Sequence, residues 1–258
     1  MVSSNDSIHS AKLSIESGGE NVGKIQTSGD NNEYVVIGNT KYLRHELMQA
    51  FGGSLNPGLS PPPKHNFANP GPLGLSAFAL TTFVLSMYNA QAMGITTPNV
   101  VVGLTFFYGG IVQLFAGLWE MMVGNTFGAT ALSSYGGFWL AFGAIHIESF
   151  GIVAAYADNE DQLPSAIGFF LVGWAIFTFM LTLCTLKSTV AFCALFSFLT
   201  MTFVLLAAGE FTGKVAVARA GGVFGVITAF LGFYNAFAGV ANKTNSYFVP
   251  HSIQLTRT

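Results

Sequence analysis

Long apolar segments alternate with short polar breaks from residue 69 to residue 241. Six of these segments are long enough for a helix to cross the hydrocarbon core of a bilayer, which takes about 20 residues. They cover residues 72–93, 98–119, 126–147, 164–185, 188–208 and 219–241. The breaks at 94–97 and 186–187 are so short that the helices beside them must run antiparallel. The pattern predicts an all-α, polytopic membrane protein whose six-helix transmembrane domain covers residues 66–245.

The first 65 residues have a different pattern, rich in Ser, Asn and Gly and without a long apolar run. Such a segment cannot bury enough apolar surface to offset its chain entropy. We expect residues 1–65 to form a mostly disordered cytoplasmic tail, with a short strand at 34–38 and an amphipathic turn at 41–51 as candidate elements. Residues 246–258 are expected to form a second, short cytoplasmic tail. Because no apolar segment lies near Met1, we expect no cleaved signal peptide.

The composition supports a membrane protein and excludes several function classes. Hydrophobic residues make up 51% of the chain and charged residues only 9%, whereas soluble domains carry about 25% charged residues. The near balance of 10 basic and 12 acidic residues gives no sign of a nucleic-acid partner. No catalytic triad, zinc-ligand spacing or phosphate-binding loop is present, so we expect neither an enzyme nor a bound metal or cofactor.

The basic residues predict the orientation of the bundle. With the amino terminus inside, the inner loops and tails hold Lys64, Lys187, Lys243 and Arg257, and the outer side holds Lys214 and Arg219. The outer loop 148–161 is acidic instead. Because basic residues in short loops stay cytoplasmic, both termini are predicted to be inside the cell.

Polar side chains at membrane depth are the candidate functional groups. They include Thr82 and Asn89 on the first segment, Thr130 and Ser134 on the third, Thr228 and Asn235 on the sixth, and the carboxylates Glu120, Glu148 and Glu210 near segment ends. One interpretation is that the hydroxyls bond to their own helices and the amides hold helices together. The other is a path for a small polar molecule, in which weak binding at several sites favours passage.

Two motifs identify a family. The first is Asn69-Pro70-Gly71-Pro72-Leu73-Gly74-Leu75, followed by Phe78; its prolines prevent a helix before Pro72 and allow one to begin there. It resembles the NPxPLGLxxF signature of the acetate uptake transporter family, also called GPR1/FUN34/YaaH, in which Ala or Val usually stands at the place of Gly71. A second stretch resembles the same family and contains Trp119-Glu120, residues 124–130 and residues 133–139. The polar tail is typical of its fungal members.

This resemblance implies a homo-hexamer in the lipid bilayer, with a path for acetate and related short monocarboxylates through each protomer. It implies an apolar constriction formed by Phe78, Tyr135 and Leu199. It also suggests Thr82, Ser134, Asn125, Asn89 and Asn235 as substrate-binding residues, and Glu120 and Glu148 as proton-relaying or entrance acids. Proton-coupled uptake at the plasma membrane is the expected activity. The sequence does not choose between a channel and alternating access, and ammonium export or a non-transporting sensor of carbon source stay open as alternatives.

Overall fold

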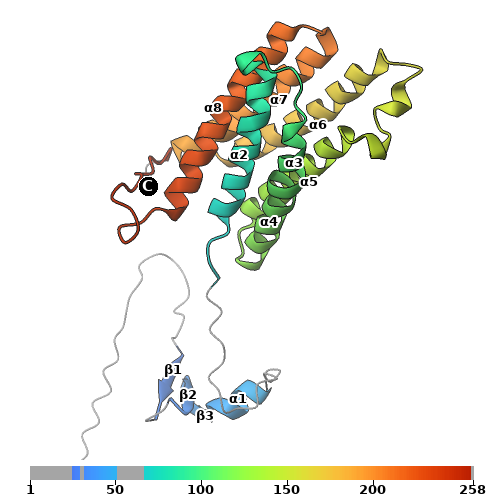
Figure 1. Cartoon of the computed structure of the whole chain (residues 1–258). Coiled ribbons are helices and arrows are strands. Elements are labelled where there is room, and N and C mark those ends of the chain that lie inside the picture. The colour runs from blue at the N-terminus through green and yellow to red at the C-terminus, as the bar shows by residue number, and fades with distance from the viewer. Residues whose placement is uncertain (1–24, 30–31, 51–66, 257–258) are drawn as a thin grey trace, which may run out of the picture. The chain divides into compact units, whose positions relative to one another are not determined.

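The computed structural model describes residues 25–29, 32–50 and 67–256, which belong to two compact units, 1–66 and 67–258. Six long helical segments build the larger unit (Figure 1). They are α2 (Gly71–Asn89), α3 (Val100–Phe106) with α4 (Gln113–Met122), α5 (Thr126–Ile145), α6 (Gln162–Cys184), α7 (Val190–Thr212) and α8 (Val215–Val240). A π-helical stretch, η2 (Phe107–Val112), joins α3 to α4 into one rod. Five of the segments are long and apolar enough to cross a membrane, and α5, with 20 residues, is the more polar sixth.

The helices occupy the predicted segments, with shifted ends. Helix α2 stops at Asn89, before the predicted residue 93, because Gln91 and Met93 have positive φ angles of 54° and 53°. Helix α7 continues to Thr212, and α8 begins as early as Val215. Glu210, just beyond the predicted segment 188–208, and Arg219, the first residue of the predicted segment 219–241, both lie within helical turns near the end of the bundle. Short 3₁₀ turns, η1 (Ala92–Gly94), η3 (Glu148–Phe150) and η4 (Ala154–Tyr156), occupy the connections.

The smaller unit corrects the prediction of an all-α chain. It contains an antiparallel sheet of β1 (Gln26–Ser28), β2 (Tyr34–Ile37) and β3 (Thr40–Leu43), followed directly by helix α1 (Arg44–Ala50). The strand predicted at 34–38 is present as β2, and the turn predicted at 41–51 is divided between β3 and α1. Two short strands on either side of β2 supply the backbone partners that a single strand lacks. The rest of the tail predicted to be disordered lies outside the described residues.

Helix α2 is the centre of the helical unit, because it packs extensively against α8 and also against α4 and η2 (Figure 1). Helix α8 presents a row of glycines to it. A Cβ atom at Gly222 would meet the backbone of Asn89 and Ala90, and one at Gly232 would lie 2.9 Å from the Cβ of Ala79. Small residues in such a row allow two helix backbones to approach closely in a membrane.

This close approach gives a stability prediction. Replacing Gly222 by Val should force α8 away from α2 and destabilise the fold by about 1–3 kcal/mol, the usual cost of overpacking. Thermal unfolding of the detergent-solubilised protein, followed by size-exclusion chromatography, measures the change. Gly173→Val on α6 is the matched control, because nothing lies within 4 Å of a Cβ placed there. Equal melting temperatures of the two variants would contradict the assigned packing.

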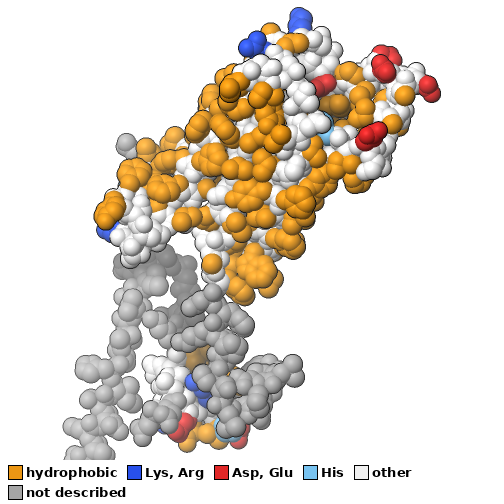
Figure 2. Space-filling model, in the orientation of Figure 1, with side chains coloured by type: hydrophobic (Ala, Val, Ile, Leu, Met, Phe, Trp, Pro, Cys, Tyr) orange, Lys and Arg blue, Asp and Glu red, His pale blue; other side chains and the backbone are white. Residues whose placement is uncertain are grey.

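The surface of the helical unit is that of a protein embedded in lipid. On the face shown in Figure 2, hydrophobic side chains cover the helices, and the charged side chains lie at the ends. Half-exposed or more exposed examples are Phe107, Phe115, Phe169, Ile176 and Phe230. The chain crosses the membrane several times, as the long apolar helices require.

The carboxyl-terminal segment folds back on the helical unit. The amide of Val190 donates to the carbonyl of Ile253 at 2.8 Å, and the amide of Leu255 donates to Ser188 at 2.9 Å. The rings of Phe237 and Phe248 stack with centroids 6.3 Å apart. Residues 242–256, which include most of the predicted tail 246–258, are therefore fixed beside the connection between α6 and α7.

Candidate functional site

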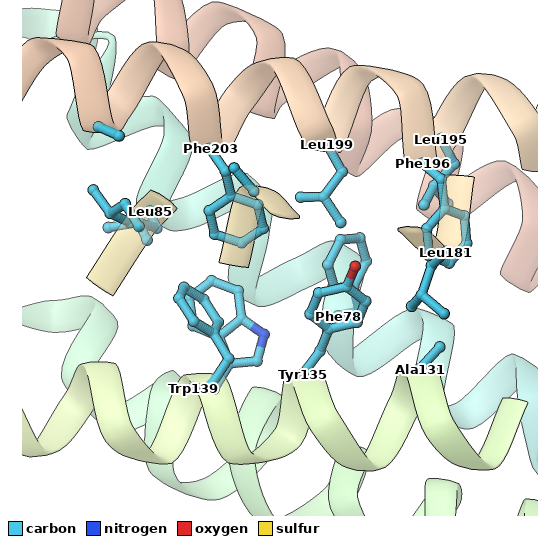
Figure 3. Close-up of a cluster of buried hydrophobic side chains, with 14 of the residues drawn as sticks. Phe78, Leu85, Ala131, Tyr135, Trp139, Leu181, Leu195, Phe196, Leu199 and Phe203 are labelled. Atoms are coloured by element: carbon cyan, nitrogen blue, oxygen red, sulfur yellow. The ribbon is translucent and has the colours of Figure 1, made fainter. Parts of the chain in front are cut away.

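Aromatic and aliphatic side chains from three helices meet in the middle of the bundle. Phe78 comes from α2, Tyr135 from α5 and Leu199 from α7, and each is at most 4% exposed. Figure 3 shows Tyr135 and Leu199 pointing toward each other from their helices, with Phe78 beside them. The ring centroids of Phe78 and Tyr135 are 5.8 Å apart. We call these three residues the neck.

Two cavities lie on opposite sides of the neck, and both are lined by Phe78 and Tyr135. Cavity 1 has a volume of about 260 Å³ and reaches the end of the bundle where α2 and α5 begin. Cavity 2 has a volume of about 160 Å³ and reaches the opposite end, where α2 and α5 finish. Leu199 lines cavity 2. The neck therefore separates two hollows that open toward opposite faces of the membrane.

The lining of the cavities is mostly apolar, with a few polar groups. Those of cavity 1 are Asn69, Gln113, Glu120, Asn125, Tyr135 and Asn235. Those of cavity 2 are Thr82, Ser86, Asn89, Tyr135, Trp139, His146, Thr202 and Glu210. An apolar hollow with a small number of polar groups is the usual form of a binding site for a small molecule.

A hydrogen bond fixes the phenol of the neck. The hydroxyls of Tyr135 and Thr178 on α6 lie 2.9 Å apart, and Thr178 is fully buried. The rings of Trp174 and Phe177, also from α6, lie within 6.0 Å and 5.7 Å of the Tyr135 ring. Packing on one side and a hydrogen bond at the tip hold Tyr135 in a single position in the neck.

Several buried polar atoms lining the cavities have no hydrogen-bond partner within the described residues. They are both amide atoms of Gln113 in cavity 1, and the hydroxyl of Thr82 and the indole nitrogen of Trp139 in cavity 2. A buried polar group without a partner costs about 1–3 kcal/mol. Because the residues that carry these atoms line hollows, molecules that enter the hollows can supply the missing partners.

Most of the signature motif shapes the mouth of cavity 1. The Asn69 side chain accepts a hydrogen bond from the amide of Gly71 at 3.0 Å, and Pro72 and Gly74 are buried. A Cβ at Gly74 would lie 2.5 Å from a methyl carbon of Leu132 and 3.1 Å from the Cβ of Ala116, so a larger residue there would force the Leu132 side chain to move. Among the motif residues Asn69, Gly71, Pro72 and Leu75 line the cavity, Pro70 precedes the first helical turn, and Leu73 is half exposed.

The predicted polar residues fall into two groups. Thr82 and Asn89 line cavity 2, and Glu120, Asn125 and Asn235 line cavity 1. Asn125 also caps α5 by accepting a hydrogen bond from Gly128. The half-buried Ser134 and the exposed Glu148 line neither cavity.

Some of the candidate polar groups bond to their own helices, as the first interpretation of the sequence expected. The hydroxyl of Thr130 donates to Thr126, that of Thr228 donates to Phe224, and the amide of Asn235 donates to Leu231. The carboxylate of Glu120 is buried, with 2% of its surface exposed. Glu210 lies in the last turn of α7, within the helix rather than beyond it.

Sequence reasoning missed Gln113, Trp139 and Thr178. Gln113 precedes Glu120 by seven residues and Trp139 follows Tyr135 by four, so helical spacing from residues already singled out places both on inward faces. Thr178 gave no such signal, because the fourth predicted segment, 164–185, contained no other candidate. Its role depends on the contact between α5 and α6.

Residues 51–257 match the model of the GPR1/FUN34/yaaH family. The chain is 62% identical over 236 residues to ammonia transport outward protein 2 of Saccharomyces cerevisiae, covering 92% of this chain and 84% of that protein. It is 52% identical over 217 residues to acetate permease A of Emericella nidulans, covering 80% and 73% of the two chains.

A solved structure gives the same relationship at the level of the fold. The bacterial acetate channel SatP superimposes with a TM-score of 0.63 at 35% sequence identity, covering 70% of this chain and 96% of that one. The family model spans well over half of the chain, including both motifs and all six helical segments. The chain therefore belongs to the GPR1/FUN34/yaaH family of membrane transporters and channels.

Proposed function

We propose that the chain carries acetate and related short monocarboxylates across a membrane through cavity 1, the neck and cavity 2. The observation that carries this proposal is that two hollows, opening toward opposite ends of the bundle, share Phe78 and Tyr135 as walls. Relatives named as an acetate permease and an acetate channel support the choice of substrate. The path runs through one chain, so each protomer of the expected homo-hexamer transports independently.

The chemistry of acetate suits this lining. A carboxyl group with a pKa of about 4 is neutral in only about one molecule in a thousand at pH 7. The charged form crosses an apolar neck at a high cost in free energy. Crossing therefore takes either a proton with each acetate or transient hydrogen bonds from the polar groups beside the neck. We favour the first, proton-coupled uptake, at the plasma membrane with both termini cytoplasmic.

Flux in liposomes tests the proposal. The purified full chain is reconstituted, and uptake of radiolabelled acetate is measured with the outside acidic or at equal pH. We expect saturable uptake that acidification of the outside accelerates and that unlabelled acetate inhibits. If folded and correctly inserted protein takes up no acetate, the proposal is wrong.

Export of ammonia is a second candidate function. It is favoured by the high identity to ammonia transport outward protein 2 and by the buried carboxylate of Glu120 in cavity 1, which attracts ammonium. The same liposomes, loaded with ammonium chloride, separate the two candidates through an internal pH dye. If the chain transports ammonia, an alkaline outside should drive faster ammonia efflux from these liposomes than from liposomes without protein. If the chain transports acetate alone, the two efflux rates should be equal.

A further inference from the structure

The side chain of Gln113 is the most unusual polar group of cavity 1. It is fully buried, and neither its amide nitrogen nor its amide oxygen has a hydrogen-bond partner among the described residues. A primary amide offers two N–H donors and one oxygen acceptor side by side. Its surroundings in the cavity include the buried carboxylate of Glu120 and the neck residues Phe78 and Tyr135.

The local backbone explains why this residue lines the cavity. Gln113 follows directly on the π-helical stretch Phe107–Val112, whose wider turns shift the residues after it around the helix axis. From there the buried face of α4 runs through Gln113, Ala116, Gly117 and Glu120 at helical spacing. Interruptions of this kind are frequent at functional sites. The π-helical stretch thus places Gln113 and Glu120 on the same inward face.

The charges around cavity 1 disfavour an anion there. Among its lining residues the titratable groups are Glu120 on α4 and Tyr135 on α5. The lining residues from α2, α7 and α8 carry no charge, and no Lys, Arg or His is among those described for this cavity. A carboxylate ion that enters this space would find no cation to balance its charge, which is unfavourable in a space of low polarity.

We propose that Gln113 binds the transported acid in its neutral, protonated form. The acid's carbonyl oxygen accepts from the amide N–H, and its O–H donates to the amide oxygen, which forms a cyclic pair of two hydrogen bonds. The carboxylate ion has no O–H and can make only the first of these bonds. This inference rests on the proposed function, and it assigns selection of the protonated substrate to cavity 1.

Cavity 2 differs in the groups that it offers. Its unpartnered atoms are the indole N–H of Trp139, which only donates, and the hydroxyl of Thr82. Groups of this kind can donate a hydrogen bond to a carboxylate ion as readily as to the neutral acid. The form in which the substrate binds is therefore set on the Gln113 side of the neck.

Acetamide provides a probe that does not titrate. It has the shape of acetic acid and carries the same adjacent donor and acceptor, so it pairs with Gln113 at every pH. In liposomes containing the full chain, acetamide should inhibit uptake of labelled acetate with the same inhibition constant at pH 5 and pH 7.5. In Gln113→Leu, which keeps the volume but removes both polar atoms, acetamide should inhibit about tenfold less well.

Gln113→Glu adds a test that a purely structural role of the side chain would not satisfy. The new carboxyl offers the same donor and acceptor only while it is protonated, so acetate uptake by this variant should depend more steeply on pH than uptake by the unmodified protein. At pH 7.5 the ionised carboxylate has no donor, so uptake should fall about tenfold further than in the unmodified protein. Size-exclusion profiles and melting temperatures check that both variants fold.

The outcomes distinguish a failure of the Gln113 proposal from a failure of the proposed function. Saturable acetate uptake that acetamide does not inhibit, or a Gln113→Glu pH profile parallel to that of the unmodified protein, would overturn the role of Gln113 and leave the proposed function intact. No acetate uptake by the unmodified protein would overturn the proposed function itself.

Discussion

Replacing Phe78 by Ala should let larger acids through the neck and raise lactate uptake at least tenfold relative to acetate uptake. The ring of Phe78 lies 5.8 Å from that of Tyr135 and forms a wall of both cavities, so its removal joins them through a wider opening. A tenfold change corresponds to about 1.4 kcal/mol in the barrier, which the removal of one steric contact can supply. Leu199→Ala should act in the same direction.

Uptake of labelled lactate and acetate in the same liposome preparation measures this ratio. Phe78→Ala also removes a buried ring, which costs about 3–5 kcal/mol of stability, so only monodisperse protein is compared. Phe169→Ala is the matched control, since that ring is 71% exposed on the outer surface of α6 and lines neither cavity. An unchanged ratio in Phe78→Ala, or an equal rise in the control, would show that Phe78 does not limit passage.

Removal of the two donors in cavity 2 should weaken acetate binding by about one to two orders of magnitude. The hydroxyl of Thr82 and the indole N–H of Trp139 are buried and unpartnered within the described residues. A hydrogen bond from such a donor to a charged group is worth about 1.5–3 kcal/mol. We therefore expect the KM for acetate to rise about tenfold in Thr82→Val or Trp139→Phe, and further in the double variant.

The neighbouring threonine provides the control for this experiment. Thr81 is fully buried as well, but its hydroxyl donates to the carbonyl of Ala77 at 2.8 Å and does not line either cavity. Thr81→Val should leave the KM within about twofold. A KM that rises equally in Thr81→Val and Thr82→Val would indicate a general effect of helix packing rather than substrate binding.

The periodicity of apolar residues was sufficient to predict the helices but not their ends. Helix ends depend on backbone conformation, as at Gln91 and Met93, and on whether a charged residue such as Glu210 can reach water from the last turn. Strands β1 (QTS) and β3 (TKYL) were missed because neither contains a run of β-branched apolar residues like that of β2 (YVVI).

The sequence led to the neck residues through the family resemblance, and the structure places all three together in the core. It did not lead to Gln113, because the apolar pattern alone does not mark this residue; only its seven-residue spacing from Glu120 does. Thr178 is identified only by its contact with Tyr135 across two helices. Features that depend on contacts between distant segments are those that a single sequence leaves open.

The path itself can be tested by blocking it from within. Ala131→Cys in cavity 1 and Thr202→Cys in cavity 2, each made with Cys184 and Cys193 replaced by Ser, are treated with a small water-soluble thiol reagent. Acetate uptake should fall by most of its value after labelling at either position. It should stay unchanged after labelling at Ile176→Cys, which faces outward from α6 with 66% of its side chain exposed. Full uptake after complete labelling at both cavity positions would show that acetate does not pass between these helices.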